Sequence, residues 1–330
     1  MMKINMSHGS GGKATSELIR DVFSEKLGNE TLNKMEDAAV FSLGQSNGRI
    51  AYTTDSFVVT PLIFKGGDIG RLSVCGTVND LLAMGATPQA LTAGFIIEEG
   101  LDLEILERIV ASMADALKEA ETRIVAADTK VIEGCGGLYI NTSGLGVIPE
   151  GLSVGASMLK PGDDILISGT LGDHHACILS HRMEIENEIK SDAAPLNGMV
   201  QALLRNKIRV RAMRDITRGG LATVLNELCD ASMVSALIQH HMLPVGESVR
   251  GLCGILGLDP LYMGNEGKLL VTVHPEDTEK ALQLIRSAPY GENAALIGSV
   301  KVGRGVHMTT ETGSTRTVNV LYGEGLPRIC

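Results

Sequence analysis

Apolar residues occur along the chain in two alternating patterns, short runs of strand length and longer segments with helical spacing. Over 103–120 they recur mostly at intervals of three and four, which predicts an amphipathic helix. Helices are also predicted from about residue 14, over 220–229 and over 275–287. Strands are predicted over 50–54, 124–127, 138–148, 164–168, 268–273, 294–302 and 315–321, with a further apolar run at 91–97. This alternation predicts an α/β or α+β fold.

The length of the chain predicts two domains. It has 330 residues, and a single hydrophobic core usually stops growing before that size. A join is predicted near Pro149-Glu150-Gly151, where a strand ends and a second mixture of helices and strands begins. We therefore expect an N-terminal domain over 1–150, a C-terminal domain over 151–321 and a tail over 322–330.

Charge and hydropathy exclude some classes of protein. The net charge is −10, which argues against binding to nucleic acid or to an anionic membrane surface. The sequence contains neither a membrane-spanning apolar stretch nor, at its start, the apolar core of a signal peptide. Six scattered cysteines without a C-x-x-C pair suit a reducing compartment, so a cytoplasmic location is expected.

The sixth cysteine, Cys330, stands at the end of the sequence. Two glycines and a proline separate it from the last apolar run, Val318–Leu321. Fully extended, the segment from Leu321 to Cys330 spans roughly 30 Å. Such a thiol is either an accident of a frayed chain end or a tethered nucleophile that enters a site elsewhere.

A glycine-rich arm near the start is a candidate phosphate site. Glycines in His8-Gly9-Ser10-Gly11-Gly12 allow backbone N–H groups to converge on an anion, and a predicted helix follows. The arm is not a P-loop, because Ser7 occupies the position of the first P-loop glycine and Ala14 follows Lys13. The alternative is a flexible leader.

Four aspartates are expected at or near the ends of predicted strands, where α/β proteins place ligand-binding groups. They are Asp37, Asp55, Asp80 and Asp128. Carboxylates that are distant in sequence can converge on Mg²⁺, which prefers oxygen ligands and usually bridges to phosphate. Lys130 is a candidate to neutralise charge on a transferring phosphoryl group. The alternatives are turn or cap residues for the aspartates, and a surface lysine or structural ion pair for Lys130.

Two later segments carry further candidates. The segment 214–220 contains Asp215 and opens a predicted helix, so it is either a second anion site or a helix start capped by Asp215 or Thr217. Glu266 lies among glycines before a predicted strand and is either a general base or acid or part of a turn. The adjacent pair His174-His175 does not form a ready metal site, because neighbouring side chains point apart.

Together these motifs resemble one family closely. The resemblance runs from residue 7 to residue 330, and the family is HypE, the hydrogenase expression/formation proteins. It rests on the glycine-rich arm and on the segments 54–56, 76–80, 128–131, 215–220, 265–267 and 327–330. The resemblance implies the two-domain fold of the aminoimidazole ribonucleotide synthetase superfamily, with an ATP-binding and dimerising α/β domain followed by an α+β domain.

The resemblance also implies a reaction and its partners. A carbamoyltransferase, HypF, would load a carbamoyl group onto the Cys330 thiol. The chain, as a homodimer using ATP and Mg²⁺, would dehydrate that group to a thiocyanate. The cyanide would pass to iron on a HypC–HypD scaffold for [NiFe]-hydrogenase.

Roles for individual residues follow from the motif match alone. Catalytic roles are implied for Cys330 as the carrier, for Lys130, and for Glu266 as the preferred base. Nucleotide contacts are implied for His8, Gly9, Ser10, Gly11, Gly12, Asp55, Asn79, Asp80, Asp128, Thr129 and Lys130. Metal contacts are implied for Asp37, Asp55, Asp80, Asp128 and Asp215.

Two alternative functions remain open from the sequence. One is a related ATP-dependent enzyme, such as thiamine monophosphate kinase or selenophosphate synthetase. The N-terminal arm lacks the cysteine or selenocysteine typical of the latter, and a kinase gives no reason for the terminal Pro-Arg-Ile-Cys. The other is a non-catalytic carrier that only presents Cys330, against which the set of aspartates argues.

Overall fold

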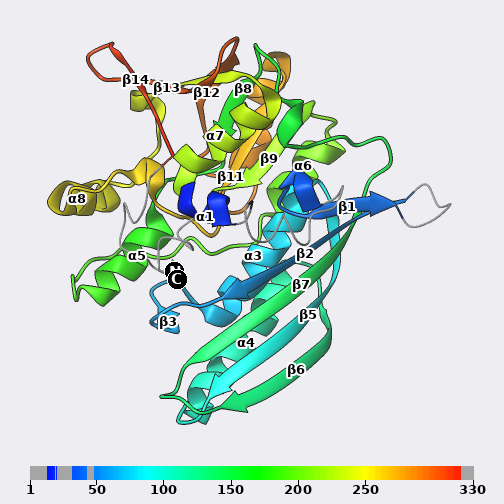
Figure 1. Cartoon of the computed structure of the whole chain (residues 1–330), viewed down its shortest axis with the longest axis vertical. Coiled ribbons are helices and arrows are strands. Elements are labelled where there is room, and N and C mark those ends of the chain that lie inside the picture. Colours follow the sequence, from blue (N-terminus) through cyan, green and yellow to red (C-terminus); the bar gives the residue numbers. More distant parts are fainter. Residues whose placement is uncertain (1–12, 19, 21–31, 43–47, 321–330) are drawn as a thin grey trace.

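The computed structural model describes residues 13–18, 20, 32–42 and 48–320 (Figure 1). The glycine-rich arm at 8–12 and the tail that carries Cys330 lie outside the described residues.

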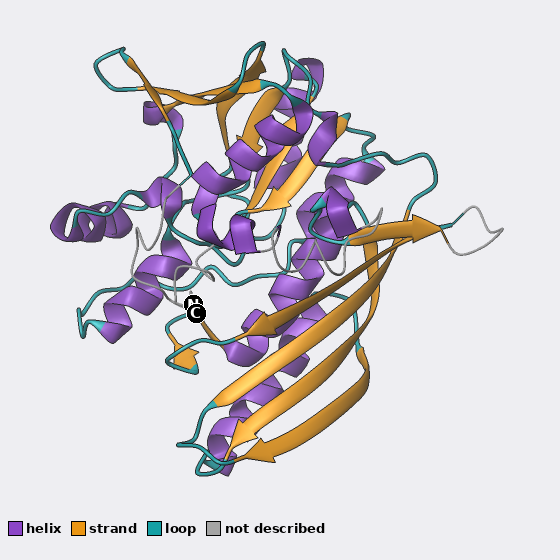
Figure 2. Cartoon of the chain, viewed as in Figure 1, coloured by secondary structure: helices purple, strands orange, loops and turns teal. Residues whose placement is uncertain are grey.

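The described elements alternate along the chain as the hydrophobic pattern predicts (Figure 2). The helices are α1 (Lys13–Leu18), α3 (Ile69–Ala83), α4 (Leu103–Glu119), α5 (Asp173–Arg182), α6 (Asn197–Arg205), α7 (Gly220–Ser232), α8 (Glu247–Leu256) and α9 (Thr278–Arg286). The strands are β1 (Ala39–Ser42), β2 (Arg49–Phe57), β3 (Ile63–Phe64), β4 (Gly67–Asp68), β5 (Thr87–Glu98), β6 (Ile124–Ile132), β7 (Leu138–Ile148), β8 (Asp164–Ile167), β9 (Val210–Asp215), β10 (Ser235–Gln239), β11 (Leu269–Val273), β12 (Ala295–Lys301), β13 (Gly305–Thr309) and β14 (Thr315–Thr317).

The first half of the chain forms a five-stranded sheet in the order β1-β2-β7-β5-β6. Helices α3 and α4 lie together on one face of this sheet (Figure 1). Helix α4 is amphipathic and buries only Ile109, Met113 and Ala116, because its other side faces solvent. Helix α3 instead buries 13 of its 15 residues, since it packs against the sheet, α4 and strand β9 of the second half.

The second half forms a seven-stranded sheet in the order β14-β13-β10-β12-β8-β11-β9. Successive side chains of a strand point to opposite faces. Accordingly, Ile165 and Ile167 of β8 join a core with α7, whereas Leu166 joins the larger core with α6 and α9. That larger core also contains residues of α3 and α4, so the two halves share buried apolar surface. The result is the two-domain mixed fold expected from the sequence.

Three of the predicted strand-end positions are wrong. Asp55 lies within β2, which keeps pairing with β7 as far as Phe57. Asp128 lies within β6, which pairs with β5 as far as Ile132. Asp80 lies on α3, a helix whose nearly uniform burial gives no helical period to read from the sequence.

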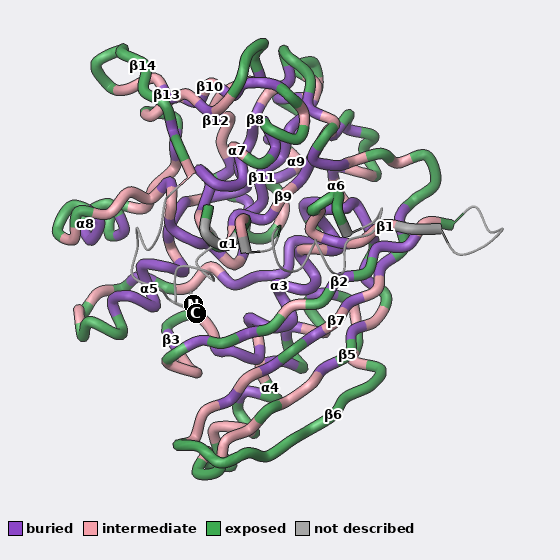
Figure 3. Tube along the Cα trace, in the orientation of Figure 1, coloured by how far each residue is buried: buried purple, intermediate pink, exposed green. Residues whose placement is uncertain are grey.

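The outer face of the first sheet, opposite α3 and α4, has no described helix over it (Figures 1 and 3). Strand β6 at the sheet edge is exposed along nearly its whole length. Tyr52, Ile96 and Val147 lie on this outer face and are open to solvent. Val125 and Val131, on the other face of β6, are exposed as well. No described helix combines the length and the apolar character that crossing a bilayer requires.

Candidate active site

A cavity of about 470 Å³ lies where the two halves meet. Strand β2 and helix α3 form one side of it, and the segments around 215–218 and 266 form the other. Five carboxyl groups line this cavity, those of Asp37, Asp55, Asp80, Asp215 and Glu266. We call this group the carboxylate cluster. Residues separated by more than 200 positions in the sequence therefore contribute to one site.

Thr53 links two members of the cluster. Its hydroxyl donates to Oδ2 of Asp80 at 2.8 Å and lies 3.1 Å from the backbone oxygen of Asp37. Thr53 is on β2 and Asp80 on α3, so this hydrogen bond ties the sheet to the helix that covers it. Burial, followed by the charges of Asp215, Asp37 and Asp55, raises the pKa of Asp80 well above its usual range.

Asp37 precedes β1 and forms an ion pair with Arg214 on β9. Arg214 also forms an ion pair with Glu227 at 3.1 Å, so one guanidinium binds a carboxylate from each half of the chain. Burial raises the pKa of Asp37 well above its usual range, and Arg214 opposes that effect. The second oxygen of Asp37, Oδ2, is buried and has no hydrogen-bond partner. An unpartnered buried carboxylate oxygen is costly, so this atom is available to a ligand.

Asp215 and Asp55 both line the cavity, as does Arg218. Burial raises the pKa of Asp215 to about 6, with Asp55 adding to the effect and Arg214 and Arg218 opposing it. Burial also raises the pKa of Asp55, which Arg218 and the Ser56 N–H lower. Asp215 is the last residue of β9.

Both backbone groups of Glu266, its N–H and its carbonyl, form hydrogen bonds to side chains. Its N–H donates to Oδ1 of Asp192 at 3.0 Å, and its carbonyl accepts from the Asn79 amide at 3.3 Å. A Cβ on Gly267 would overlap the Asp192 carbonyl oxygen, so only glycine permits this close approach. Burial, followed by the charges of Asp215, Asp55 and Asp192, raises the pKa of Glu266 well above its usual range. The backbone contacts leave the Glu266 side chain directed to the cavity that it lines.

The Asn79 side chain binds backbone groups in this chain. Besides Glu266, its amide donates to the Ala194 carbonyl at 3.0 Å and accepts from the Leu196 N–H at 3.0 Å. The residue is 2% exposed. Its three hydrogen bonds join α3 to two segments of the second half, so Asn79 supports the site by positioning Glu266.

The structure does not bring Asp128, Thr129 and Lys130 to the cavity within one chain. The register aligns Asp128 with Gly94, Asn141 and Ser56 in one row across the sheet. Ser56 and Asp55 are adjacent in β2, so Asp128 lies on the opposite face from Asp55. Three strand spacings, about 14 Å, separate their strands.

On β6, Lys130 pairs instead with Asp128 at 2.6 Å, and both side chains are exposed. The hydrogen bond from Lys130 lowers the pKa of Asp128. In the single chain Lys130 therefore forms an ion pair, which is one of the two alternatives to a catalytic role that the sequence leaves open. These residues could act at the cavity only if β6 of a second copy of the chain brought them there.

The donor chemistry of the cluster suits Mg²⁺. Within the described residues, no three His, Cys, Asp or Glu side chains are arranged as a complete metal site. Mg²⁺ needs no such site, because it is commonly held by one or two carboxylates together with water and phosphate oxygens. The free Oδ2 of Asp37 and the mutual repulsion of Asp80, Asp215 and Asp55 both favour a bound cation. The residues present therefore fit a magnesium ion.

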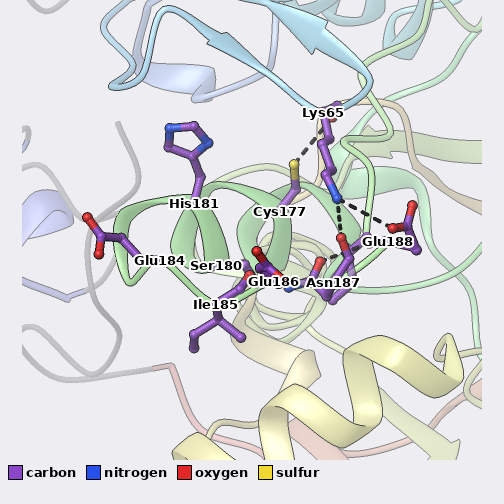
Figure 4. Close-up of a pocket in the computed structure, with 10 residues that line it drawn as sticks. Lys65, Cys177, Ser180, His181, Glu184, Ile185, Glu186, Asn187 and Glu188 are labelled. Atoms are coloured by element: carbon purple, nitrogen blue, oxygen red, sulfur yellow. Dashed lines mark hydrogen bonds and ion pairs between the residues drawn. The ribbon is translucent and has the colours of Figure 1, made fainter.

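A larger cavity of about 580 Å³ lies beside α5 and the segment that follows it (Figure 4). Glu184, Glu186 and Glu188 line it, and all three are exposed. Lys65 is 3.8 Å from Glu188 and also donates to the Asn187 carbonyl. Because its one lysine already has these partners, this cavity is poorly suited to the phosphates of a nucleotide.

Sequence reasoning missed three residues of the site. Arg218 lies in the segment 214–220 and lines the cavity, but the sequence alone indicates no role for it. Asp192 and its buried ion pair with Lys268, at 3.1 Å, gave no sequence signal, because nothing near Asp192 resembles a motif. Only the fold brings Asp192 to the backbone of Glu266.

Comparisons with known proteins agree with this geometry. The family model for the AIR synthase related protein N-terminal domain matches residues 35–148, and the model for the C-terminal domain matches residues 160–310. The chain is 47% identical over 333 residues to the carbamoyl dehydratase HypE of Azotobacter vinelandii, covering 99% of this chain and 97% of that protein.

Solved structures give the same result. A HypE–HypF complex contains a chain that is 47% identical and superposes with a TM-score of 0.87, covering 92% of this chain and 99% of that one. A HypE in complex with ATP is 44% identical with a TM-score of 0.83, covering 99% of this chain and 100% of that one. The chain therefore belongs to the HypE family of carbamoyl dehydratases, within the AIR synthase related proteins.

Proposed function

We propose that this chain uses ATP to dehydrate a carbamoyl group carried on the Cys330 thiol, giving a thiocyanate. The cyanide would supply the iron of [NiFe]-hydrogenase during its maturation. The carboxylate cluster around one buried cavity carries the proposal, since it is the described site whose chemistry suits Mg-ATP. A HypE that is 44% identical has been crystallised with ATP, which supports nucleotide binding at this fold.

The reaction balances without a redox partner. The carbamoyl oxygen attacks the γ-phosphorus of ATP, ADP leaves, and the nitrogen loses one proton. The carbon–oxygen bond then breaks, phosphate leaves with that oxygen, and loss of the second N–H proton completes the C≡N bond. The chain must therefore bind the phosphates, admit the carbamoylated thiol and accept protons from nitrogen.

The residues of the cavity divide these tasks. The carboxylate cluster would hold Mg²⁺, which neutralises phosphate charge when bound. The Arg218 guanidinium faces the same cavity and is suited to phosphate oxygens. Glu266 is our choice of base, because its backbone is fixed by Asp192 and Asn79 and its carboxyl lines the cavity. The glycine-rich arm at 8–12 would cover the phosphates.

We further propose that the active form is a homodimer paired through the first sheet. On the uncovered outer face, Tyr52, Ile96 and Val147 are 45%, 44% and 43% exposed, and strand β6 is exposed along nearly its whole length. Exposed apolar patches and free sheet edges are typical of protein interfaces. Pairing would give Asp128, Thr129 and Lys130 a route to the cavity of the partner subunit.

The proposed partners follow the order of the reaction. HypF would load the thiol, as the crystallised HypE–HypF complex of a 47% identical relative suggests. A HypC–HypD complex would accept the cyanide. Besides these partners, the reaction would use ATP and Mg²⁺, and we propose that it takes place in the cytoplasm.

Intact-protein mass spectrometry after co-expression with the carbamoyltransferase tests the proposal. We expect the chain to gain one carbamoyl group and, on addition of Mg-ATP, to lose one water. Asp80→Asn should weaken Mg-ATP binding in calorimetry without preventing carbamoylation. Carbamoylated protein that keeps its mass in the presence of Mg-ATP would refute the dehydratase assignment and favour a pure carrier.

A further inference from the structure

A third cavity, of about 450 Å³, lies beside α8 and has no role in the proposed reaction. Its wall combines apolar side chains, such as Leu171, Leu243, Val245 and Leu258, with polar and charged ones. Cavities of this size with apolar walls and a few polar groups are typical binding sites. We call it the α8 cavity.

One cation at the rim of the α8 cavity has no described partner. Arg316 pairs with Asp259 at 3.1 Å, and His240 lies 3.3 Å from Glu311. Arg250 is exposed, and its side chain makes no ion pair or hydrogen bond to any described residue. The cavity therefore suits a ligand that combines apolar groups with one negative charge.

The chain itself supplies such a segment close by. Strand β14 carries Arg316 into the rim, and Val318 is anchored by hydrogen bonds to Val306 and to the Asn226 amide. The described residues end at Val320, only four positions after Arg316. Four residues span at most about 14 Å, so the segment beyond Val320 starts within that distance of the cavity rim.

The composition of that segment matches the cavity. Residues 321–326 read Leu-Tyr-Gly-Glu-Gly-Leu, with three apolar side chains and a single carboxylate, Glu324. Six residues reach at most about 21 Å, which is enough to turn back to the rim. Gly323 and Gly325 flank Glu324 and permit the tight turn that such a return requires.

We propose that the α8 cavity is a docking site for residues 321–326 of this same chain, with Tyr322 and Leu326 on the apolar wall and the Glu324 carboxylate on Arg250. Docking leaves only residues 327–330 beyond the anchored segment, which limits the reach of Cys330 to about 14 Å from the α8 cavity. What this limit means for the reaction of Cys330 rests on the proposed function. The docking of residues 321–326 does not depend on that function.

A fluorescent reporter tests docking without ATP or a carbamoyl group. The chain contains no tryptophan, so Tyr322→Trp in the full-length protein introduces a single indole. We expect its emission to be shifted to shorter wavelength and protected from acrylamide, compared with the same protein in denaturant. Leu326→Trp provides a second reporter if the first substitution impairs folding.

Charge variants then identify the contact. An exposed ion pair of this kind changes the docking equilibrium by about two- to five-fold, so Arg250→Ala should raise the quenching constant of the indole by about that factor. Glu324→Gln should do the same, and the double variant should add little, because both changes remove one interaction. Arg304→Ala, at an exposed arginine away from the cavity, is the matched control and should have no effect.

Two results would overturn the proposal. One is an indole that is equally accessible to acrylamide with and without Arg250. The other is protection that disappears on dilution of the protein, which would identify a second copy of the chain as the occupant. Either result leaves the dehydratase assignment untouched, because neither measurement involves the carboxylate cluster.

Discussion

The buried carboxyl of Asp215 should destabilise the protein at neutral pH when no divalent cation is present. Its pKa is raised from the usual 3.8 to about 6, chiefly by burial. Below pH 4 the group is protonated in both folded and unfolded chains and costs nothing. Between about pH 4 and pH 6 the group ionises in the unfolded chain but stays protonated in the fold, so the free energy of unfolding falls over that interval and stays lower above pH 6.

The size of this effect can be worked from the pKa. A difference of about two pH units corresponds to about 3 kcal/mol at neutral pH. The entropy of unfolding for a chain of this length is about 0.7 kcal/mol/K, so removing the penalty should raise Tm by about 4 °C. We therefore expect Asp215→Asn in EDTA to be about 4 °C more stable than wild type at pH 7.

The assay is thermal unfolding at pH 4 and pH 7, each with EDTA and with Mg²⁺. At pH 4 the Tm difference between Asp215→Asn and wild type should vanish. At pH 7 Mg²⁺ should raise the Tm of wild type more than that of the variant, because asparagine is the weaker ligand. Asp115→Asn, at an exposed position of α4, is the control and should show neither effect. A difference that is equal at both pH values would refute the reasoning.

Three further substitutions test the roles of Cys330 as carrier, Glu266 as base and Asn79 as a positioning residue. Cys330→Ala should leave the fold and ATP binding intact but abolish thiocyanate formation, and a thiocyanate mass on another cysteine would contradict this. Glu266→Gln should lower the dehydration rate of carbamoylated protein by about 10²- to 10⁴-fold with little change in ATP affinity; a normal rate in single-turnover mass spectrometry would transfer the base role elsewhere. Asn79→Ala leaves three buried backbone groups unpaired and should cost about 3 kcal/mol in chemical denaturation; a loss under 1 kcal/mol would show that water replaces the amide.

Helix and strand positions with a clear hydrophobic period were predictable. The helix over 103–120 and the strand over 138–148 appear as α4 and β7 with the same bounds to within one residue. In both elements one side is buried and the other is more exposed, so apolar residues recur along the sequence with the period of a helix or a strand. Helix α3 could not be found in this way, because it is buried on nearly all sides and its apolar residues show no period.

The sequence by itself determined which side chains the protein has for its chemistry, and the family resemblance followed from short local segments around Asp55, Asp80, Asp215 and Glu266. Only the tertiary structure decided which of them meet. It brought these four and Asp37 to one cavity, yet put Asp128 and Lys130 on the opposite face of the sheet. The physical reason is that strand register and the packing of α3 between the two halves are long-range contacts, which no local spacing of residues encodes.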